Sequence, residues 1–151
     1  MRLIYHSPIG DIALDSDGSA LTGLRFADNQ GVADFAEAPV FEAAVRWLDR
    51  YFAGGIPDFE PPLRMIGTPF QQSVWRELMT IPYGQTATYG DIARRIGCRS
   101  AQAVGGAVGR NPIAIIVPCH RVVGADGSLT GYAYGLEIKQ QLLQLEHNHR
   151  L

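Results

Sequence analysis

The sequence predicts an α+β protein with a small N-terminal α/β domain, which contains an antiparallel sheet, and a mostly helical C-terminal domain with a helix-turn-helix. Three observations predict this. Short apolar segments broken by turn residues open the chain, apolar residues at helical spacing dominate its second half, and a proline-rich stretch lies between them. We expect an N-terminal supporting domain over 1–60, a linker over 61–67 and a second domain over 68–151.

The N-terminal domain begins with the pattern of a small antiparallel meander. Its three apolar segments are Leu3–Tyr5, Asp11–Asp15 and Leu21–Phe26. The turn residues that interrupt them are Ser7-Pro8, Ser16-Asp17-Gly18 and Asp28-Asn29.

A helix over 40–53 is expected next, because apolar side chains recur at helical spacing up to Gly54-Gly55, a pair that can end a helix. These side chains are Phe41, Val45, Leu48 and Phe52. The stretch from Ile56 to Gly67 contains three prolines and is interpreted as a linker.

The second domain is expected to begin with a helix that Thr68 caps and that has Pro69 in its first position. This helix should run to about Thr80, before the Pro82-Tyr83-Gly84 stop. Its expected buried stripe is Phe70, Val74, Trp75 and Leu78.

Two further short helices predict the helix-turn-helix. Thr88 should cap a helix over Tyr89–Ile96, which ends at Gly97, and another should run from Ser100 to about Val108. The turn between them is Gly97–Arg99.

The last of these helices is almost without side chains, since it contains Ala101, Ala103, Gly105, Gly106 and Ala107. Two adjacent glycines destabilise a helix by roughly 1 kcal/mol each. Tight packing against another helix would explain them. Close approach of the backbone to a nucleic acid groove would explain them equally well, and composition alone leaves both open.

Charge is distributed unevenly along a chain of 151 residues whose net charge is −2. Residues 1–66 contain five basic and ten acidic residues, and residues 67–151 contain eight basic and five acidic ones. Such asymmetry indicates that the second domain meets a polyanion. The two cysteines and four histidines have no zinc-site spacing, and no signal peptide or membrane-length apolar run is present, so we expect no metal, no membrane contact and a cytoplasmic location.

Cys119 follows a β-rich apolar run, Ala114–Val117, and precedes His120. A cysteine after a buried strand is most often a small core residue. The neighbouring imidazole allows a second interpretation, a nucleophile whose proton His120 accepts, because a thiol attacks as the thiolate. In an extended segment His120 would need a turn or a bridging water to act on Cys119. The spacing alone leaves both interpretations open.

The C-terminal helix is expected to bury Leu136, Leu142, Leu143 and Leu145. Glu146 lies at the edge of this stripe. If partly buried it needs a partner, and a histidine is suitable because a carboxylate orients the imidazole ring. The alternative, a solvent-facing glutamate near a helix end, is the one that the sequence alone favours.

The segment from Ile116 to Gly124, IVPCHRVVG, resembles the active-site motif of the O6-alkylguanine-DNA alkyltransferases, or methylated-DNA–protein-cysteine methyltransferases. The family's other motifs are matched, in order and spacing, by GTPFQ at 67–71, IPYG at 81–84, TYG at 88–90, AVGGA at 103–107, NPI at 111–113 and LTGYA at 129–133. The resemblance covers residues 67–147, whereas residues 1–60 are compatible with the family's variable N-terminal domain.

The resemblance implies direct DNA repair, in which the alkyl group of O6-alkylguanine, and also of O4-alkylthymine, is transferred irreversibly to Cys119 in a single turnover. The helix-turn-helix would bind the minor groove of double-stranded DNA through the small-residue helix. The damaged base would be flipped out into a pocket, at a cost of a few kcal/mol. No cofactor is implied.

The resemblance also assigns roles to individual residues. Cys119 is the nucleophile, His120 takes its proton through a water, and Glu146 holds His120. Tyr89 would give or share a proton at N3 of the base, making guanine a better leaving group, and Asn111 would brace the turn before the active-site segment. The expected pocket residues are Val122, Tyr132, Ala133 and Tyr134. The expected DNA-binding residues are Ala101, Gln102, Ala103, Gly105 and Arg110.

Two positions depart from the family pattern. Gln102 stands where many members have an arginine that fills the gap left by the flipped base, so we expect weaker and less salt-sensitive DNA binding. Tyr134 stands where members often have glycine, so we expect methyl groups to be accepted and benzyl-sized groups to enter poorly. Cys98, in the turn, is interpreted as structural. Arg99 and Arg110 either contact phosphates or are solvated.

Two other classes of function are compatible with parts of the sequence. A non-catalytic sensor of alkylated DNA would bind the same lesions, but such proteins lack the cysteine. A Cys–His hydrolase would need an oxyanion hole and would turn over many times. We expect a monomer in solution.

Overall fold

The computed structural model describes residues 1–26 and 38–149, so the predicted break at Asp28-Asn29 lies outside the described residues. The chain divides into two compact units, Met1–Ile66 and Gly67–Leu151, and each has a hydrophobic core of its own. Within the described part of the chain, no helix is both long and apolar enough to cross a bilayer.

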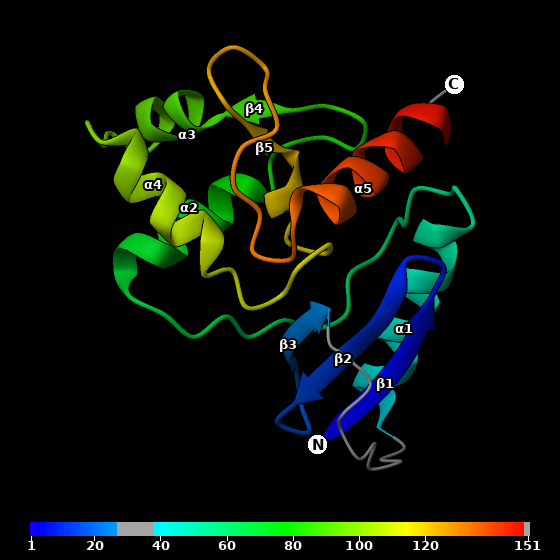
Figure 1. Cartoon of the computed structure of the whole chain (residues 1–151). Coiled ribbons are helices and arrows are strands. Elements are labelled where there is room, and N and C mark those ends of the chain that lie inside the picture. The colour runs from blue at the N-terminus through cyan, green and yellow to red at the C-terminus, as the bar shows by residue number, and fades with distance from the viewer. Residues whose placement is uncertain (27–37, 150–151) are drawn as a thin grey trace. The chain divides into compact units, whose positions relative to one another are not determined.

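The N-terminal unit contains a three-stranded antiparallel sheet with β1 (Arg2–Ser7), β2 (Gly10–Ser16) and β3 (Leu21–Phe26) in that order, which confirms the predicted meander (Figure 1). The central strand is β2, and its Ile12, Ala13 and Leu14 are buried. These are the side chains around which the core of this unit forms.

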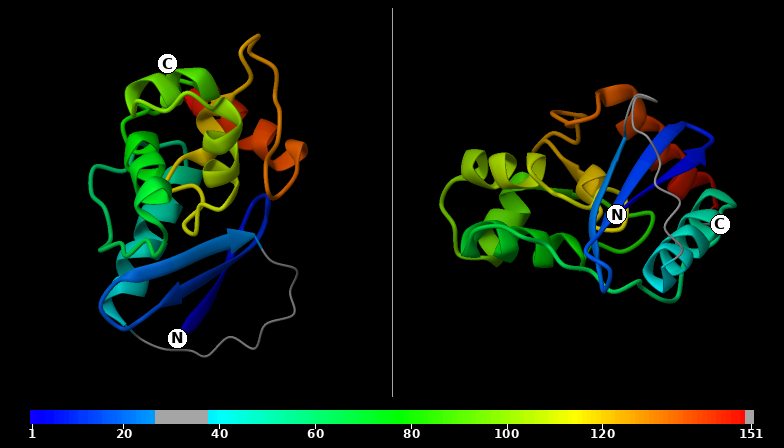
Figure 2. Two further views of the ribbon diagram at one scale, coloured as in Figure 1. Left: turned by 90° about the vertical axis from the view of Figure 1, so that its left-hand side faces the viewer. Right: turned by 90° about the horizontal axis from the view of Figure 1, so that it is seen from below.

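One helix, α1 (Pro39–Phe52), contacts all three strands and covers one face of this sheet (Figures 1 and 2). The prediction of a helix over 40–53 is therefore confirmed. Its buried face is centred on Phe41, Ala44, Leu48 and Tyr51, whereas Val45 and Phe52 are only half-buried.

Part of the predicted linker pairs with this sheet. Leu63 forms a parallel bridge with Leu21, whose backbone N–H donates to the Pro62 carbonyl at 2.7 Å. The Arg64 N–H donates to the Leu21 carbonyl at 2.9 Å. These bonds attach residues 62–64 to the N-terminal unit.

The second unit begins with α2 (Pro69–Leu78), which has the predicted cap. The Thr68 hydroxyl accepts from the Gln71 N–H and the Gln71 side chain accepts from the Thr68 N–H, a capping box that satisfies two backbone donors. Val74, Trp75 and Leu78 are buried as predicted, but the expectation for Phe70 was wrong, since it is 37% exposed. The fully buried side chains of this helix begin at Val74, one turn after Phe70.

Gly67 packs closely against the side chain of Trp75 at the start of α2. A Cβ on Gly67 would lie 2.4 Å from the indole of Trp75, so no side chain fits there. On its other side the Trp75 indole N–H donates to the Ala107 carbonyl at 2.9 Å. A single buried tryptophan thus connects the start of α2 with the second helix of the helix-turn-helix, α4 (Ala101–Gly109).

The helix-turn-helix is present as predicted, with α3 (Tyr89–Arg95) and α4 (Ala101–Gly109) packed on each other and on α2. Thr88 caps α3 in a second capping box and the Ser100 hydroxyl accepts from the Ala103 N–H to cap α4. Gly97, at a φ of 72°, turns the chain in the left-handed conformation that glycine tolerates.

The expectation of a β-rich run before the active-site motif was wrong. Residues 114–116 form a turn in which Ile115 has a φ of 69°, a conformation uncommon for a β-branched residue. The run is apolar because it is buried, and the Asn111 amide, together with backbone hydrogen bonds inside the turn, bonds its backbone in place of a sheet. Only Val122–Val123, β5, forms a strand, parallel to β4 (Ala87–Thr88).

The last helix, α5 (Leu136–His149), exists as predicted, and Leu142 is buried as predicted, but the rest of the expected stripe is not. Leu136 is 48% exposed and Leu143 and Leu145 are half-buried, so these expectations were wrong. The fully buried residues are Lys139, Leu142 and Glu146, which share one face of the helix. Polar partners reach both charged side chains and make their burial possible.

Candidate active site

The segment that carries Cys119 is a short 3-10 turn, η1 (Cys119–Arg121), followed directly by β5. The pairing of β5 with β4 places this turn beside the start of α3, because Ala87 pairs with Val122 and Thr88 with Val123. A turn, and not the extended segment that the residue spacing suggested, therefore sets the relation of Cys119 to His120. Both side chains are buried.

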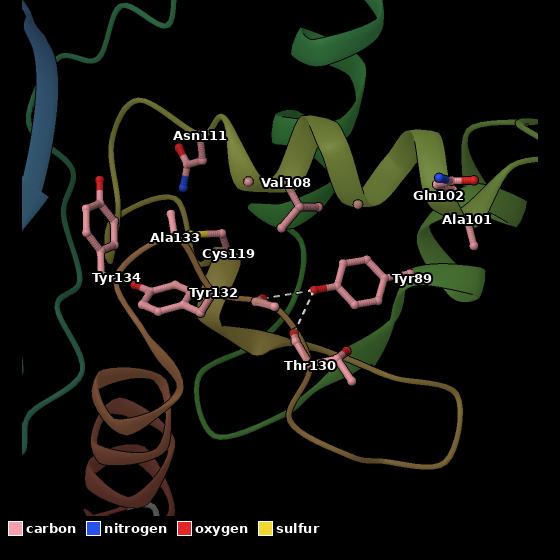
Figure 3. Close-up of a pocket in the computed structure, with 13 residues that line it drawn as sticks. Tyr89, Ala101, Gln102, Val108, Asn111, Cys119, Thr130, Tyr132, Ala133 and Tyr134 are labelled. Carbon is pink, nitrogen blue, oxygen red and sulfur yellow. Dashed lines mark hydrogen bonds between the residues drawn. The ribbon is translucent and has the colours of Figure 1, made fainter.

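Asn111 braces the backbone that leads to this turn. Its Nδ2 donates to the Val117 carbonyl at 2.8 Å and its Oδ1 accepts from the Ile113 N–H at 3.0 Å. Both bonds are buried, so the amide closes the loop over residues 113–117. Asn111 also lines the cavity into which Cys119 faces (Figure 3).

This cavity has a volume of about 650 Å³ and lies between α4 and the loop that precedes α5 (Figure 3). Its lining combines Tyr89, Asn111, Cys119 and the loop residues Thr130–Tyr134 with the small-residue helix, which contributes Ala101, Gln102, Gly105, Val108 and Gly109. It thus brings together most of the residues that the resemblance assigned to the pocket and to DNA. A volume of this size is typical of sites for small ligands.

Tyr89 extends from α3 toward the loop on the opposite side of the cavity (Figure 3). Its hydroxyl donates to the carbonyl oxygens of Thr130 and Gly131, at 3.1 and 3.3 Å. Burial raises the pKa of Tyr89, so the phenol is protonated near neutral pH and can act as a donor. The two bonds also hold the loop in position.

Tyr132 and Tyr134 form the other side of the lining, and their rings meet edge to face with centroids 5.5 Å apart. Burial raises the pKa of Tyr132, whose hydroxyl lies close enough to influence the thiol of Cys119. Tyr134 adds a large ring where the family pattern often has no side chain.

Behind the cavity, His120 and Glu146 form a buried pair. His120 Nε2 lies 2.5 Å from Glu146 Oε2, and neither side chain is more than 1% exposed. The sequence alone favoured a solvent-facing glutamate, and this was wrong. The physical reason is a set of partners far away in sequence, since Glu146 also accepts from the Gly84 N–H at 3.1 Å and from Arg121.

Arg121 was not identified as a site residue from the sequence. Its Nε donates to Glu146 Oε1 at 2.8 Å, its Nη2 to Glu146 Oε2 at 3.1 Å and its Nη1 to the Ile81 carbonyl at 2.8 Å. The guanidinium also lies over the Tyr83 ring, 5.7 Å from its centroid. The only sequence signal was its place in the motif directly after His120.

Lys139 was also missed, because a lysine inside a helix is normally assigned to the surface. It is fully buried, and its Nζ donates to the Val122 carbonyl at 2.6 Å and to the Thr130 carbonyl at 3.0 Å. Burial lowers its pKa, and the nearby Cys119 opposes this. The ammonium therefore joins the strand after Cys119 to the loop that lines the cavity.

Burial raises the pKa of the Cys119 thiol, while polar contacts from Asn111, the Lys139 charge and Tyr132 lower it. The net effect is a thiol that remains protonated near neutral pH. It needs a base to become the nucleophilic thiolate.

Burial lowers the pKa of His120, against the opposing effect of Glu146. The ring is therefore neutral near neutral pH. With Nε2 donating to Glu146, its lone pair lies on Nδ1, so it can accept a proton.

The outer face of α4 shows whether tight helix packing explains its small residues. Ala101, Gln102, Ala103 and Gly106 are exposed, and nothing lies within 4 Å of the position of a Cβ on Gly106. Tight helix packing therefore does not account for the small residues on this face. It is smooth and accessible to a partner.

Three of the residues predicted for the pocket or for DNA binding do not line the cavity. Val122 is buried in β5, and its carbonyl accepts from Lys139. Ala103 and Arg110 are exposed on and after α4. Among the residues that the structure describes, no group of His, Cys, Asp or Glu is arranged to hold a metal ion.

Fold and site define a class of protein: a helix-turn-helix domain whose smooth recognition helix borders a cavity with a buried cysteine, backed by a His–Glu pair. The family model for the DNA-binding domain of 6-O-methylguanine DNA methyltransferase matches residues 69–148. The model for the ribonuclease-like domain of the same family matches residues 2–65.

Relatives and solved structures agree with the family models. The methylated-DNA–protein-cysteine methyltransferases of Methanosarcina acetivorans and Mycobacterium leprae are each 50% identical, over 95% and 96% of this chain and 96% and 91% of their own. The crystal structure of Mycobacterium tuberculosis OGT in complex with DNA matches with a TM-score of 0.88 and 49% identity, over 98% of this chain and 93% of that one. The chain belongs to the 6-O-methylguanine DNA methyltransferase family.

Proposed function

We propose that this protein repairs DNA directly, by transferring the alkyl group of O6-alkylguanine irreversibly to Cys119 in a single turnover. The observation that carries this proposal is the position of Cys119, whose thiol faces the cavity while His120 and Glu146 form a buried acid–base pair behind it. The relatives of similar length are named for this activity and support it.

In the transfer, the Cys119 sulfur forms a bond to the alkyl carbon while the bond from that carbon to O6 of guanine breaks. The thiol proton passes through one water to Nδ1 of His120, and Glu146 stabilises the imidazolium that forms. The guanine departs with the electrons of the broken bond and receives a hydrogen bond or a proton at N3 from Tyr89. The thioether product has no facile reverse reaction, so the protein is consumed.

DNA is held, in this proposal, with the outer face of α4 in the minor groove and the target base flipped into the cavity. Exposed Ala101, Ala103 and Gly106 permit close approach of the backbone. Gln102 lines the mouth of the cavity and can hydrogen-bond the orphaned partner base. O4-alkylthymine is a second substrate. A monomer suffices, because one unit of one chain supplies every residue of the site, and two free cysteines suit a reducing cytoplasm.

Mass spectrometry after incubation with a duplex containing one O6-methylguanine tests the proposal. The expected result is one methyl group on the Cys119 peptide, saturating at one per protein and absent in Cys119→Ser. Cys98→Ser is the matched control, since Cys98 lies in the helix-turn-helix and should leave the transfer intact. Binding without added mass would instead identify a lesion sensor, and repeated turnover on an ester would identify a hydrolase.

A further inference from the structure

Arg121 and Glu146 form a tight ion pair inside the second unit, and Oε2 of the same carboxylate also contacts His120. The guanidinium contacts both carboxylate oxygens, at 2.8 and 3.1 Å, and the imidazole contacts Oε2 at 2.5 Å. Arg121, His120 and Glu146 are all at most 8% exposed. Solvent screening of charge is therefore weak among these three groups.

A buried glutamate strengthens a histidine as a general base only while the imidazole is still neutral at the working pH. An ionised carboxylate in direct contact with an imidazole favours the imidazolium, which has no lone pair left to accept the thiol proton. The Cys119 thiol is buried and needs that base. Burial of His120 opposes this effect of Glu146, and a positive charge bonded to the carboxylate opposes it further.

We propose that Arg121 is a positioning residue that holds Glu146 in place by its bidentate contact and, by its charge, keeps His120 neutral and ready to accept the Cys119 proton. The inference rests on the proposed role of His120 as the base. It explains why the arginine is oriented by a third bond, to the Ile81 carbonyl, and by the Tyr83 ring, so that its charge cannot move away from the pair.

The other charged and titratable groups around His120 are few. Helix α5 contributes Glu146 and Lys139, η1 contributes Cys119 and Arg121, and the segment before β4 contributes Tyr83 beside Arg121 and Glu146. Lys139 acts in the same direction as Arg121 on His120, and Glu146 acts against both. Arg121, unlike Lys139, is bonded to the Glu146 carboxylate itself, so its removal should change the pKa of His120 most directly.

The test is a titration of His120 in the full-length protein, followed by the nitrogen shifts of the histidine rings in NMR and assigned with His120→Gln. In the wild type, His120 should be neutral at pH 7.5 with the proton on Nε2. In Arg121→Gln its pKa should rise by at least about one unit, because a neighbouring charge typically shifts a pKa by about 1–3 units. In Arg121→Lys, which keeps the charge, it should stay near the wild-type value.

The rate of methyl transfer gives the second readout. The pH below which the rate falls should move upward by the same amount in Arg121→Gln and should be restored in Arg121→Lys. Arg50→Gln, which removes an exposed arginine from the N-terminal unit, is the control that should move neither quantity. If Arg121→Gln lowered the rate by one factor at every pH and left the titration unmoved, the residue would be merely structural and the inference wrong.

Two results remain decisive if Arg121→Gln does not fold. An imidazolium at His120 in the wild type at pH 7.5 would overturn the inference without any variant. A titration in Arg121→Lys that moved as far as expected for full loss of the charge would overturn it as well. The NMR titration needs no DNA, so its outcome is separate from failure of the proposed methyl transfer.

Discussion

Replacement of Glu146 by glutamine should destabilise the protein strongly, although the two side chains have nearly the same shape. The carboxylate accepts hydrogen bonds from Arg121, His120 and the Gly84 N–H and is fully buried. The amide keeps one acceptor oxygen and places a donor against Arg121 or His120. It also leaves the Arg121 charge buried without its counter-charge.

The magnitude follows from the pKa of Glu146. Burial raises the pKa of Glu146, but its hydrogen bonds with His120 and Arg121 and the positive charges on its partners outweigh this effect and lower the pKa from 4.5 to about 2. At about 1.36 kcal/mol per pKa unit, the ionised form contributes about 3 kcal/mol to the free energy of unfolding near pH 7. Removal of one partner of a buried ion pair typically costs about 3–5 kcal/mol, which agrees.

The pH dependence has a definite sign. Because the pKa of Glu146 is lower in the folded than in the unfolded state, its contribution is complete above the unfolded value of 4.5 and is lost as the pH falls toward about 2. The Glu146 carboxylate by itself should therefore contribute about 3 kcal/mol at pH 7 and about 2 kcal/mol at pH 3.5. His120, whose pKa burial lowers, adds a loss of stability below pH 6.5 that is larger in Glu146→Gln, because Glu146 opposes that lowering.

Urea denaturation followed by circular dichroism at both pH values measures the difference. Glu137→Gln is the matched control, because Glu137 is exposed in the first turn of the same helix and should change stability by less than about 0.5 kcal/mol. A Glu146→Gln protein as stable as the wild type at pH 7 would refute the assignment of Glu146 as a buried, ionised partner.

Three further predictions concern the cavity and the recognition helix. Tyr134→Gly should raise the rate of Cys119 benzylation by O6-benzylguanine at least about tenfold, equivalent to about 1.4 kcal/mol, with little change for O6-methylguanine, because the ring that meets Tyr132 narrows the cavity. Equal rates of the wild type with both substrates would contradict this reasoning. Gln102→Arg should bind duplex DNA more tightly at low salt, with a slope of log K against log salt steeper by about 0.9 if one phosphate contact is gained, and an unchanged slope would count against it. Asn111→Ala should lose about 2–3 kcal/mol of stability in urea denaturation, since it leaves a buried carbonyl and a buried N–H of the 113–117 turn without partners, and a loss below 0.5 kcal/mol would show that the turn does not depend on the amide.

Features decided by neighbouring residues could be predicted from the sequence. The starts of α2, α3 and α4 follow from Thr68, Thr88 and Ser100, because a capping hydroxyl acts on backbone groups two or three residues away. The strands of the meander follow from alternation and turn residues for the same reason. The motif around Cys119 was sufficient to indicate the family.

Local pattern could not decide features whose partners lie far apart in the chain. The apolar run before Cys119 is compatible with a strand, and it forms a turn in which the Asn111 amide and bonds within the turn take the place of a neighbouring strand. Exposure of Phe70 depends likewise on how much of α2 other elements cover.

The charged residues of the site show the difference most clearly. An amphipathic pattern places lysine, arginine and glutamate on the surface, because burial of a single charge is costly. In the folded chain, Glu146 meets Arg121 and Gly84, which lie 25 and 62 residues away, and Lys139 meets carbonyls 17 and 9 residues away. Local sequence thus determined where the helices begin and the motif that points to Cys119 as the proposed nucleophile. The tertiary structure determined the buried charges around it, since only the folded chain supplies the partners that make their burial possible.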